Sequence, residues 1–343
     1  MTLSPGLETD RLIAVVVGSK SLAARTRTIS SVRETRSWQF VLKSISHQEL
    51  EAGRDVLKAC QQLGIDVIPF LSPLYPLVLA EIPDPPAVLF VRSRAFAHVS
   101  KSFCVGVVGT RAASIEMCHR ASELASDLVA GGVTVVSGLA LGIDGAAHRG
   151  ALQGNPACPT IAVLAHGLDE LYPPSHRPLA EAIVTSGGAL ISEYPPGVGP
   201  LKHQFLARNR IIAGLSRGVV VVEAGARSGS LVTARFAADF GRDVFVMDGA
   251  TSDERTAGGI SLIEQGATRI ARGGDVLLEY GLSHHPIKET GEMLELSLDD
   301  LSKQIGASIS DILRLELSGL VRCVPGNRCV IGARILRELL DAQ

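Results

Sequence analysis

Three short turns in this sequence combine glycine, hydroxyl and cationic residues in a way that suits the binding of phosphate groups. They are residues 109–111 (GTR), 137–144 (SGLALGID) and 228–230 (SGS), and each follows an apolar run. Backbone N–H groups at the start of a helix attract anions, and a guanidinium at that positive end is favoured only when an anion is also present. We therefore expect Arg111 and these turns to bind a phosphate.

A simpler interpretation is available for each turn. Gly109 and Gly138 would then only permit tight turns, and Ser228 or Ser230 would cap a helix. The repetition of three such turns along one chain favours the phosphate interpretation, because successive backbone N–H groups and hydroxyls form anion-binding concavities.

Alternating strands and helices are the elements that must position these turns. Short apolar runs predict six strands at residues 104–108, 133–136, 160–164, 188–192, 218–223 and 243–247. Helical patterns, each closed or followed by glycine, lie at residues 146–152, 179–185, 206–214 and 231–240. We predict a Rossmann-like, doubly wound and mostly parallel α/β sheet, in which ligands bind at the carboxyl ends of the strands.

A second cationic cluster lies at residues 202–210, where Lys202, Arg208 and Arg210 occur with a histidine. On a helix, Arg208 and Arg210 point in different directions, so they cannot both serve one contact. A solvated helix start is the simpler interpretation. Asn209 between the two arginines, followed by an apolar run, argues against it.

Composition bounds the function. With 46% hydrophobic and 20% charged residues, the 343-residue chain is typical of a soluble globular protein, and its formal net charge of −2 excludes a globally basic nucleic-acid coat protein. The six cysteines form no CxxC pair and no metal-ligand spacing, which predicts reduced thiols, no metal and no cofactor. The apolar run at residues 12–17 is too short to span a membrane, so we expect a cytoplasmic protein without membrane contact.

The remaining segments predict a modular chain. We expect residues 1–45 to be poorly ordered or loosely docked, and residues 46–100 to form a small helical and extended region, with a helix at 46–63 that ends at Gly64. The main domain spans residues 101–278 and is followed by a linker at 279–293.

The last segment, residues 294–343, predicts a winged-helix-like unit. Its helices are expected at residues 298–305 and 308–317, with a hairpin around residues 325–327. Eight acidic residues against six basic ones from residue 291 onward favour protein contact or dimerisation over the reading of a DNA groove.

Several long motifs together resemble the DNA-processing protein A family, DprA or Smf. They are VGTRAAS at 108–114, SGLALGIDGAAHRGAL at 137–152, IAVLAHGLDELYP at 161–173, GGALISEYPPG at 187–197, FLARNRIIAGLS at 205–216, VVVEAGARSGSLVTARFAADFGRDVFV at 220–246 and GGISLIEQGA at 258–267. The resemblance covers roughly residues 65–275 in one uninterrupted order. The final unit is similar to the family's winged-helix end.

The resemblance implies a non-enzymatic homodimer that binds and protects single-stranded DNA and loads the recombinase RecA in transformation or recombinational repair. It places no catalytic residue. The residues that we assign to the DNA and phosphate site are Gly109, Thr110, Arg111, Ser137, Gly138, Gly142, Asp144, Lys202, Phe205, Arg208, Asn209, Arg210, Ser228, Gly229 and Ser230.

This sequence departs from the family pattern at three places. Pro174 stands where the family often has a basic residue, and residues 248–249 (DG) stand where it usually has Pro-Gly. The N-terminal region lacks a clear helix-hairpin-helix glycine signature. Few aromatic residues lie near the predicted edge, namely Tyr172, Tyr194 and Phe205. We therefore expect DNA binding to depend mainly on the charged phosphate backbone and to show little sequence preference.

Two enzyme classes are alternatives for such a sheet. A dinucleotide-dependent enzyme is disfavoured because Gly106 and Gly109 do not make a GxGxxG motif. A nucleotide-processing hydrolase, similar to phosphoribohydrolases, would carry a Pro-Gly-Gly-x-Gly-Thr run, whereas residues 225–230 read GARSGS.

Four residues near the predicted edge could act as an acid or base. We expect Asp144 to accept hydrogen bonds from backbone N–H groups or from an arginine, and His148 to be a hydrogen-bonded partner on its helix. The other two candidates are Glu193 and Glu223. A third class is an adaptor protein that works through the C-terminal unit alone. This class does not explain the presence of the three turns.

Overall fold

The computed structural model describes residues 5–19, 22–154, 160–248, 256–282, 293–304, 321–324 and 328–332. The chain forms two compact units, Met1–Gly273 and Gly274–Gln343.

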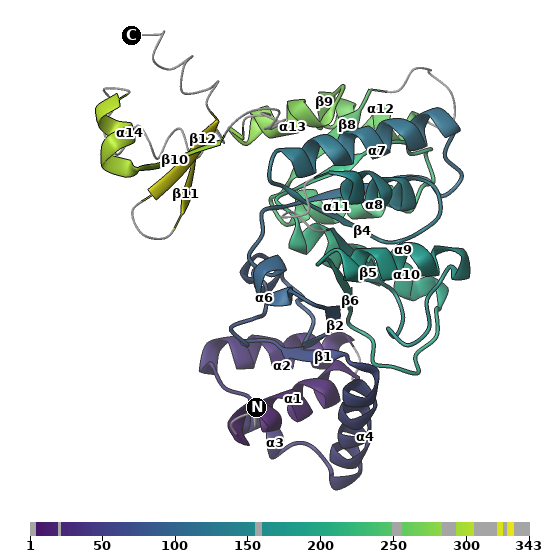
Figure 1. Ribbon diagram of the computed structural model, residues 1–343. Coiled ribbons are helices and arrows are strands. Elements are labelled where there is room, and N and C mark those ends of the chain that lie inside the picture. The colour runs from purple at the N-terminus through teal and green to yellow at the C-terminus, as the bar shows by residue number, and fades with distance from the viewer. Residues whose placement is uncertain are drawn as a thin grey trace. The chain divides into compact units, whose positions relative to one another are not determined.

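A nine-stranded sheet forms the centre of the first unit (Figure 1), in the order β1-β2-β6-β5-β4-β3-β7-β8-β9. The strands from β6 to β9 in this order pair in parallel, whereas β2 pairs antiparallel with both β1 and β6. Their bounds are β1 Asp66–Pro69, β2 Val88–Ser93, β3 Cys104–Val108, β4 Thr134–Ser137, β5 Ile161–Leu164, β6 Ala189–Ser192, β7 Gly218–Val221, β8 Asp243–Met247 and β9 Thr268–Ile270. The six strands predicted for the main domain are thus confirmed, and three more extend the sheet.

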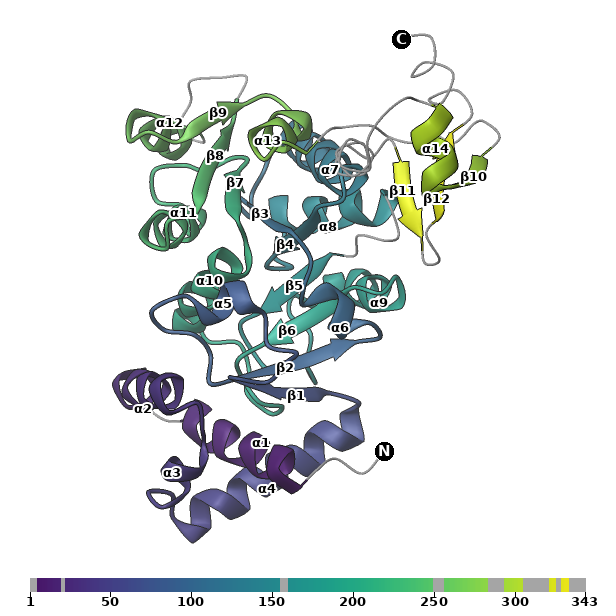
Figure 2. The same ribbon diagram turned by 90° about the vertical axis from the view of Figure 1, so that its left-hand side faces the viewer.

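Helices cover both faces of this sheet (Figure 2). The helices α7 (Ile115–Ala130), α8 (Ile143–Gln153) and α9 (Arg177–Thr185) lie on one face, and α10 (Lys202–Leu215) and α11 (Ser230–Asp239) lie on the other. Strand β3 is buried along its whole length, as expected for a parallel strand covered on both faces. The doubly wound α/β architecture is confirmed.

The strand order fixes where the predicted turns meet. From β3 the chain builds β4, β5 and β6 on one side, and it then returns to place β7 beside β3 on the other side. The carboxyl ends of β3 and β7 therefore form a topological switch point, which is where open α/β sheets bind ligands. The turns 109–111 and 228–230 both follow these strand ends.

The N-terminal segment is folded, so our expectation of poor order or loose docking for residues 1–45 is wrong for its described part. Helices α1 (Pro5–Gly18), α2 (Leu22–Thr35) and α3 (Gln39–Leu42) precede α4 (His47–Leu63). Residues 13–17 are all buried, because α1 packs between α4 on one side and β1 and β2 on the other. A helix buried on two sides shows a continuous apolar run instead of a 3.6-residue period, which explains the weak pattern in the sequence.

Within residues 46–100, the helix predicted at 46–63 corresponds to α4. Ser46 and Glu49 form a capping box at the start of α4, and Gly64 ends that helix with a positive φ of 64°. The short helices α5 (Leu77–Ala80) and α6 (Phe96–Val99) lie on the connections that flank β2. After β8, helix α12 (Ala257–Glu264) leads into β9.

The second unit contains a three-stranded sheet in the order β10-β12-β11. Its elements are β10 (Met293–Ser297), α14 (Leu298–Gln304), β11 (Val321–Val324) and β12 (Arg328–Gly332), and helix α13 (Gly273–Glu279) begins at the unit boundary. The first predicted helix and the hairpin strands are confirmed. The predicted helix at 308–317, most of the linker and the turn at 325–327 lie outside the described residues, so the winged helix stays a prediction.

Two expectations from composition can be compared with the described residues. Cys60 and Cys104 are buried in the core, and Cys118 is half-buried; none of the three forms a disulfide. No helix within the described ranges is both long and apolar enough to cross a membrane.

Trp38 provides a test of the N-terminal packing, because it is the single tryptophan of the chain. Its side chain is 1% exposed and its Nε1 donates to the carbonyl of Phe70 at 2.8 Å. We predict that Trp38→Ala lowers the free energy of unfolding by about 3 to 5 kcal/mol, through lost burial and an unpaired carbonyl. Urea denaturation followed by far-UV circular dichroism measures this loss.

The matched control is Phe40→Ala, since Phe40 is 42% exposed. It should change the free energy of unfolding by less than about 1 kcal/mol. Equal stability of Trp38→Ala and the wild type would contradict the packed N-terminal region.

Candidate functional site

A pocket of about 320 Å³ lies at the switch point, between the turn after β3, the start of α11 and the exposed turns of α10. It brings together most of the predicted site residues, although they come from four separate stretches of sequence. The predicted residues that line it are Gly109, Thr110, Arg111, Asp144, Phe205, Arg208, Asn209, Ser228, Gly229 and Ser230. Ala140, from the predicted turn 137–144, also lines it, as do Leu206 and Thr233, which no charge or spacing signal in the sequence marked.

Glu223 holds the turn after β3 in place. Its carbonyl accepts from the N–H of Thr110 at 2.8 Å, and its carboxylate accepts from the N–H of Ser114 at 3.2 Å. Gly109 fits because a Cβ there would lie 3.0 Å from the Glu223 carbonyl and closer still to Ile143. The glycine therefore permits close packing at the switch point, and Arg111 follows as an exposed residue.

Arg208 is a buried cation at the base of the pocket. Its side chain donates to the carbonyl of Val163, and its Nε has no hydrogen-bond partner among the described residues. The guanidinium occupies the space that a Cβ on residue 138 would need, so Gly138 is required to admit it. The pKa of Arg208 is lowered to about 10, chiefly by burial; Asp144 opposes this shift and the neighbouring Arg111 adds to it. The residue remains charged at neutral pH.

Asp144 orders the loop after β4. Its Oδ2 accepts from the N–H groups of Gly138 at 3.2 Å and Ala140 at 3.4 Å, which confirms the expected role as a loop-fixing acceptor. Burial raises the pKa of this carboxyl, and Arg208 and Arg111 offset part of that rise. The pocket therefore contains two guanidinium groups, buried Arg208 and exposed Arg111, against one carboxylate, so its net charge is positive and attracts an anion.

An aromatic and cationic surface borders the pocket. The Cζ of Arg111 lies 4.8 Å from the centre of the Phe205 ring, and the rings of Phe205 and Tyr172 meet edge to face with centroids 6.0 Å apart. Tyr172 is 44% exposed. Exposed ring faces beside cations suit the stacking of unpaired bases next to a bound phosphate.

The start of α11 supplies hydroxyl and N–H groups. The Oγ atoms of Ser228 and Ser230 lie 2.7 Å apart, and the N–H of Ser230 donates to Ser228 Oγ at 3.3 Å. Asn209 donates its Nδ2 to the Gly229 carbonyl at 3.1 Å and so ties α10 to this turn. The N-cap residue of α11 is Gly229, and the helix has no side-chain capping hydrogen bond, so neither serine caps it in the expected way. The same turn also lines the pocket.

Five predicted residues lie outside the pocket lining. The hydroxyl of buried Ser137 donates to the Val107 carbonyl at 2.6 Å and joins neighbouring strands. Gly138 makes room for Arg208, and Gly142 precedes α8. Lys202 is an exposed residue at the first position of α10. Arg210 is the fifth residue.

Arg210 belongs to a buried ion-pair network, so its assignment to phosphate is corrected. Its Nη1 and Nη2 donate to Glu193 at 3.0 and 2.7 Å, and its Nε donates to Asp84 at 3.0 Å. Arg25 of α2 lies 3.4 Å from Glu193 and 3.5 Å from Asp84. Burial alone would lower the pKa of Arg210, but the two carboxylates raise it above its ordinary value. Two cations and two anions leave this network no charge for a ligand.

Removal of Arg210 tests this structural role. We predict that Arg210→Ala lowers the free energy of unfolding by about 3 to 5 kcal/mol, because Glu193 is left buried with an incomplete set of partners. Chemical denaturation of the purified variant measures the loss.

The control for this variant is Lys202→Ala, which changes an exposed residue of the same helix. Its effect should be within about 0.5 kcal/mol. A destabilisation of Arg210→Ala no larger than that of Lys202→Ala would show that the network contributes nothing to the fold.

The acid and base candidates are all engaged in structural contacts. His148 is fully buried, its Nδ1 lies 2.9 Å from Thr160 Oγ1, and burial lowers its pKa to about 3. Glu193 pairs with arginines, and Glu223 fixes the turn after β3. Within the described ranges, no group of three or more histidine, cysteine or carboxylate side chains is placed to hold a metal ion.

Comparison with known proteins decides the family. A family model described as DNA recombination-mediator protein A matches residues 66–281. The chain belongs to this family. The matched region contains all three turns and α10, so the resemblance seen in the sequence is confirmed.

Proteins from two different bacteria are similar to this chain in sequence. The chain is 38% identical over 293 residues to Protein Smf of Escherichia coli strain K12, which covers 78% of this chain and 77% of that protein. It is 44% identical over 210 residues to DNA processing protein DprA of Streptococcus pneumoniae, which covers 61% and 72% respectively.

Solved structures of the family share the fold. The X-ray structure of DNA processing protein A from Streptococcus pneumoniae matches with a TM-score of 0.60 and 39% identity, over 71% of this chain and 81% of that one. A structure of DNA processing protein A from Helicobacter pylori, whose subject is its single-stranded DNA binding mode, matches with a TM-score of 0.54 and 28% identity. That match covers 61% of this chain and 94% of the other.

Proposed function

We propose that this recombination mediator binds single-stranded DNA with the pocket at the switch point. The observation that carries the proposal is the charge balance of the pocket, where Arg111 and buried Arg208 face a single carboxylate, that of Asp144. A phosphate supplies the missing negative charge, and the N–H groups at the start of α11 favour it further. The structure of the Helicobacter pylori relative, which concerns single-stranded DNA binding, supports the same ligand.

The features around the pocket favour a single strand over a duplex. A volume of about 320 Å³ admits a phosphate with its sugar and excludes a double helix. Phe205 and exposed Tyr172 offer ring surface to bases, and stacking contributes about 1 to 3 kcal/mol per base only where the bases are unpaired. Stacking accepts every base, so we expect little sequence preference. Exposed Lys202 lies on α10, the helix that carries Phe205, where it can reach a neighbouring phosphate.

The function that we propose is non-enzymatic. The protein protects the bound strand, acts as a homodimer and transfers the strand to the recombinase RecA in transformation or recombinational repair. Membership of the recombination-mediator family supports this role, and the structural engagement of Asp144, His148, Glu193 and Glu223 agrees with binding without chemistry.

The binding site is tested with Arg111→Ala. We predict that this variant binds a fluorescent oligo-dT strand about ten- to a hundredfold more weakly than the wild type, because one cation of the pocket and its contact with Phe205 are lost. The slope of log K against log salt should become shallower by about 0.7, the value for one phosphate contact on a single strand. Fluorescence anisotropy across a salt series measures both quantities, and a matched duplex should bind weakly throughout.

Arg94→Ala is the matched control, since Arg94 is an exposed arginine outside the pocket lining. It should bind the strand as the wild type does. Equal loss in the two variants would indicate non-specific charge attraction, and no loss in Arg111→Ala would remove the pocket from the proposal.

The transfer step is tested in a RecA assembly assay. We predict that the wild-type protein accelerates the formation of RecA filaments on strands coated with a single-strand-binding protein, and that Arg111→Ala loses this effect in proportion to its loss of DNA affinity. Light scattering would follow filament growth, and sizing of the free protein would show whether it is a dimer. Acceleration by a variant that no longer binds DNA would contradict a transfer mechanism.

A further inference from the structure

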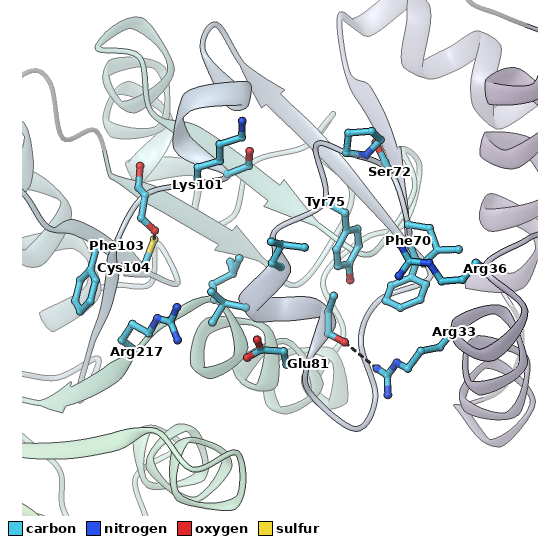
Figure 3. A pocket seen from close by; sticks show the side chains of 18 residues that line it. Arg33, Arg36, Phe70, Ser72, Tyr75, Glu81, Lys101, Phe103, Cys104 and Arg217 are labelled. Carbon is cyan, nitrogen blue, oxygen red and sulfur yellow. Dashed lines mark hydrogen bonds between the residues drawn. The ribbon is translucent and has the colours of Figure 1, made fainter. Parts of the chain in front are cut away.

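A second and larger cavity, of about 960 Å³, lies in the same unit as the phosphate pocket (Figure 3). Its walls come from the end of α2, the segment 70–81 that contains α5, and residues 100–104 and 215–217. Cys104 begins β3, and Arg217 immediately precedes β7. The cavity therefore lies beside the amino ends of these strands, at the opposite edge of the sheet from the phosphate pocket. We call it the amino-edge cleft.

Basic residues stand on two sides of the amino-edge cleft. Arg33 and Arg36 come from α2 and the turn after it, whereas Lys101 and Arg217 come from the segments that lead into β3 and β7, and Figure 3 shows the two groups on opposite sides. All four are exposed. Among the described residues that line the cleft, Glu81 is the one carboxylate.

The positive charge of the cleft is poorly compensated. Glu81 pairs with Arg242 at 2.9 Å, so Arg242 neutralises its charge and it does not compensate the basic residues of the cleft. Arg33 donates to the carbonyls of Ala80 at 2.8 Å and Ile82 at 3.1 Å, which are neutral acceptors. An uncompensated cationic rim raises the local concentration of anionic partners.

The floor between the basic groups is apolar. Leu71, Pro73 and Leu77 line it, and Leu77 is 80% exposed. An exposed leucine beside a cavity contributes little to folding, and it becomes favourable once another apolar group covers it. The cleft thus combines an apolar surface with cations at both sides.

We propose that the amino-edge cleft binds an acidic peptide segment of a partner protein, in which carboxylates flank a bulky apolar side chain. The apolar side chain would cover Leu77, and the carboxylates would pair with Arg36 on one side and Arg217 on the other. Arginine forms bidentate pairs with carboxylates, and such pairs at the two ends would fix the register of the peptide.

A nucleic acid fits the amino-edge cleft less well. Its backbone carries a charge at every nucleotide, so phosphates would lie over the apolar floor between the basic groups. The ring of Phe70 is 2% exposed and that of Tyr75 is 4% exposed, and the Tyr75 hydroxyl donates to the Pro86 carbonyl at 2.8 Å. These rings offer no free face for the stacking that holds single strands.

The test uses the full-length protein and a panel of fluorescein-labelled, end-capped nonapeptides. Each peptide carries one leucine or phenylalanine between two pairs of glutamates, and the number of alanine spacers varies across the panel. Anisotropy titrations at low salt should show micromolar binding of at least one spacing. Replacement of its glutamates by glutamine, or of its apolar residue by alanine, should weaken binding at least tenfold.

Variants locate the site on the protein. Arg36→Gln combined with Arg217→Gln should weaken binding of the best peptide at least tenfold, and Leu77→Ser should weaken it severalfold. Arg94→Gln, an exposed arginine outside the cleft lining, is the charge-matched control and should leave the affinity unchanged. The cleft variants change exposed side chains, so they should keep the wild-type melting temperature and the wild-type affinity for oligo-dT.

Three outcomes would overturn the proposal. Failure of every peptide in the panel to bind excludes an acidic segment of this design. Equal affinity for the glutamate and glutamine peptides shows that the basic rim has no part in binding. Loss of oligo-dT affinity in the Arg36→Gln and Arg217→Gln double variant, with unchanged peptide affinity, assigns the cleft to nucleic acid instead.

Discussion

The burial of guanidinium groups on α10 is the constraint on which the arrangement of the first unit depends. A charge taken out of water must be paired or compensated, and α10 buries two arginines that are two positions apart. Because positions i and i+2 lie on different sides of a helix, each arginine needs its own set of partners. These partners hold α10 against the face of the sheet and connect it, through Glu193, to Arg25 of helix α2.

The charges of the two arginines are compensated in different ways. This difference distinguishes a residue that stabilises the fold, Arg210, from one that belongs to the binding pocket, Arg208. Arg210 lies in a network whose charges balance, and the members of this network come from α2, from the loop before β2 and from the residue after β6. Arg208 shares one carboxylate with Arg111 and lies against a glycine that leaves it room. A balanced network holds parts of the chain together, whereas an unbalanced one is completed by a ligand.

The sequence predicts the carboxyl edge of the sheet well because the signals there are local. Gly109, Arg111 and Ser228 each lie within three residues of the strand end or helix start that places them at the pocket. A strand-turn-helix pattern in the sequence is enough to identify such positions. Arg210 could not be assigned in the same way. Its partner Asp84 lies 126 residues away, and a sequence does not show which distant carboxylate will meet a cation.

The same reasoning explains the other differences between prediction and structure. The second half of α1, residues 12–17, is a continuous apolar run because the helix is covered on two sides, so no amphipathic period is present there to detect. Strand β9 has only three residues, and so short a run carries too few alternations to be distinguished from a loop. The amino-edge cleft has no motif, since its four basic residues are scattered from position 33 to position 217.

Strand β3 has one further consequence, because one of its ends borders each of the two cavities. Its five residues span about 17 Å at roughly 3.3 Å per residue, and it is buried throughout. A protein held at one end of this strand and a DNA strand held at the other would be neighbours on a rigid support, without any competition for surface. Such tethering replaces a chance encounter between the two ligands by a high effective concentration, which for short tethers is in the millimolar range.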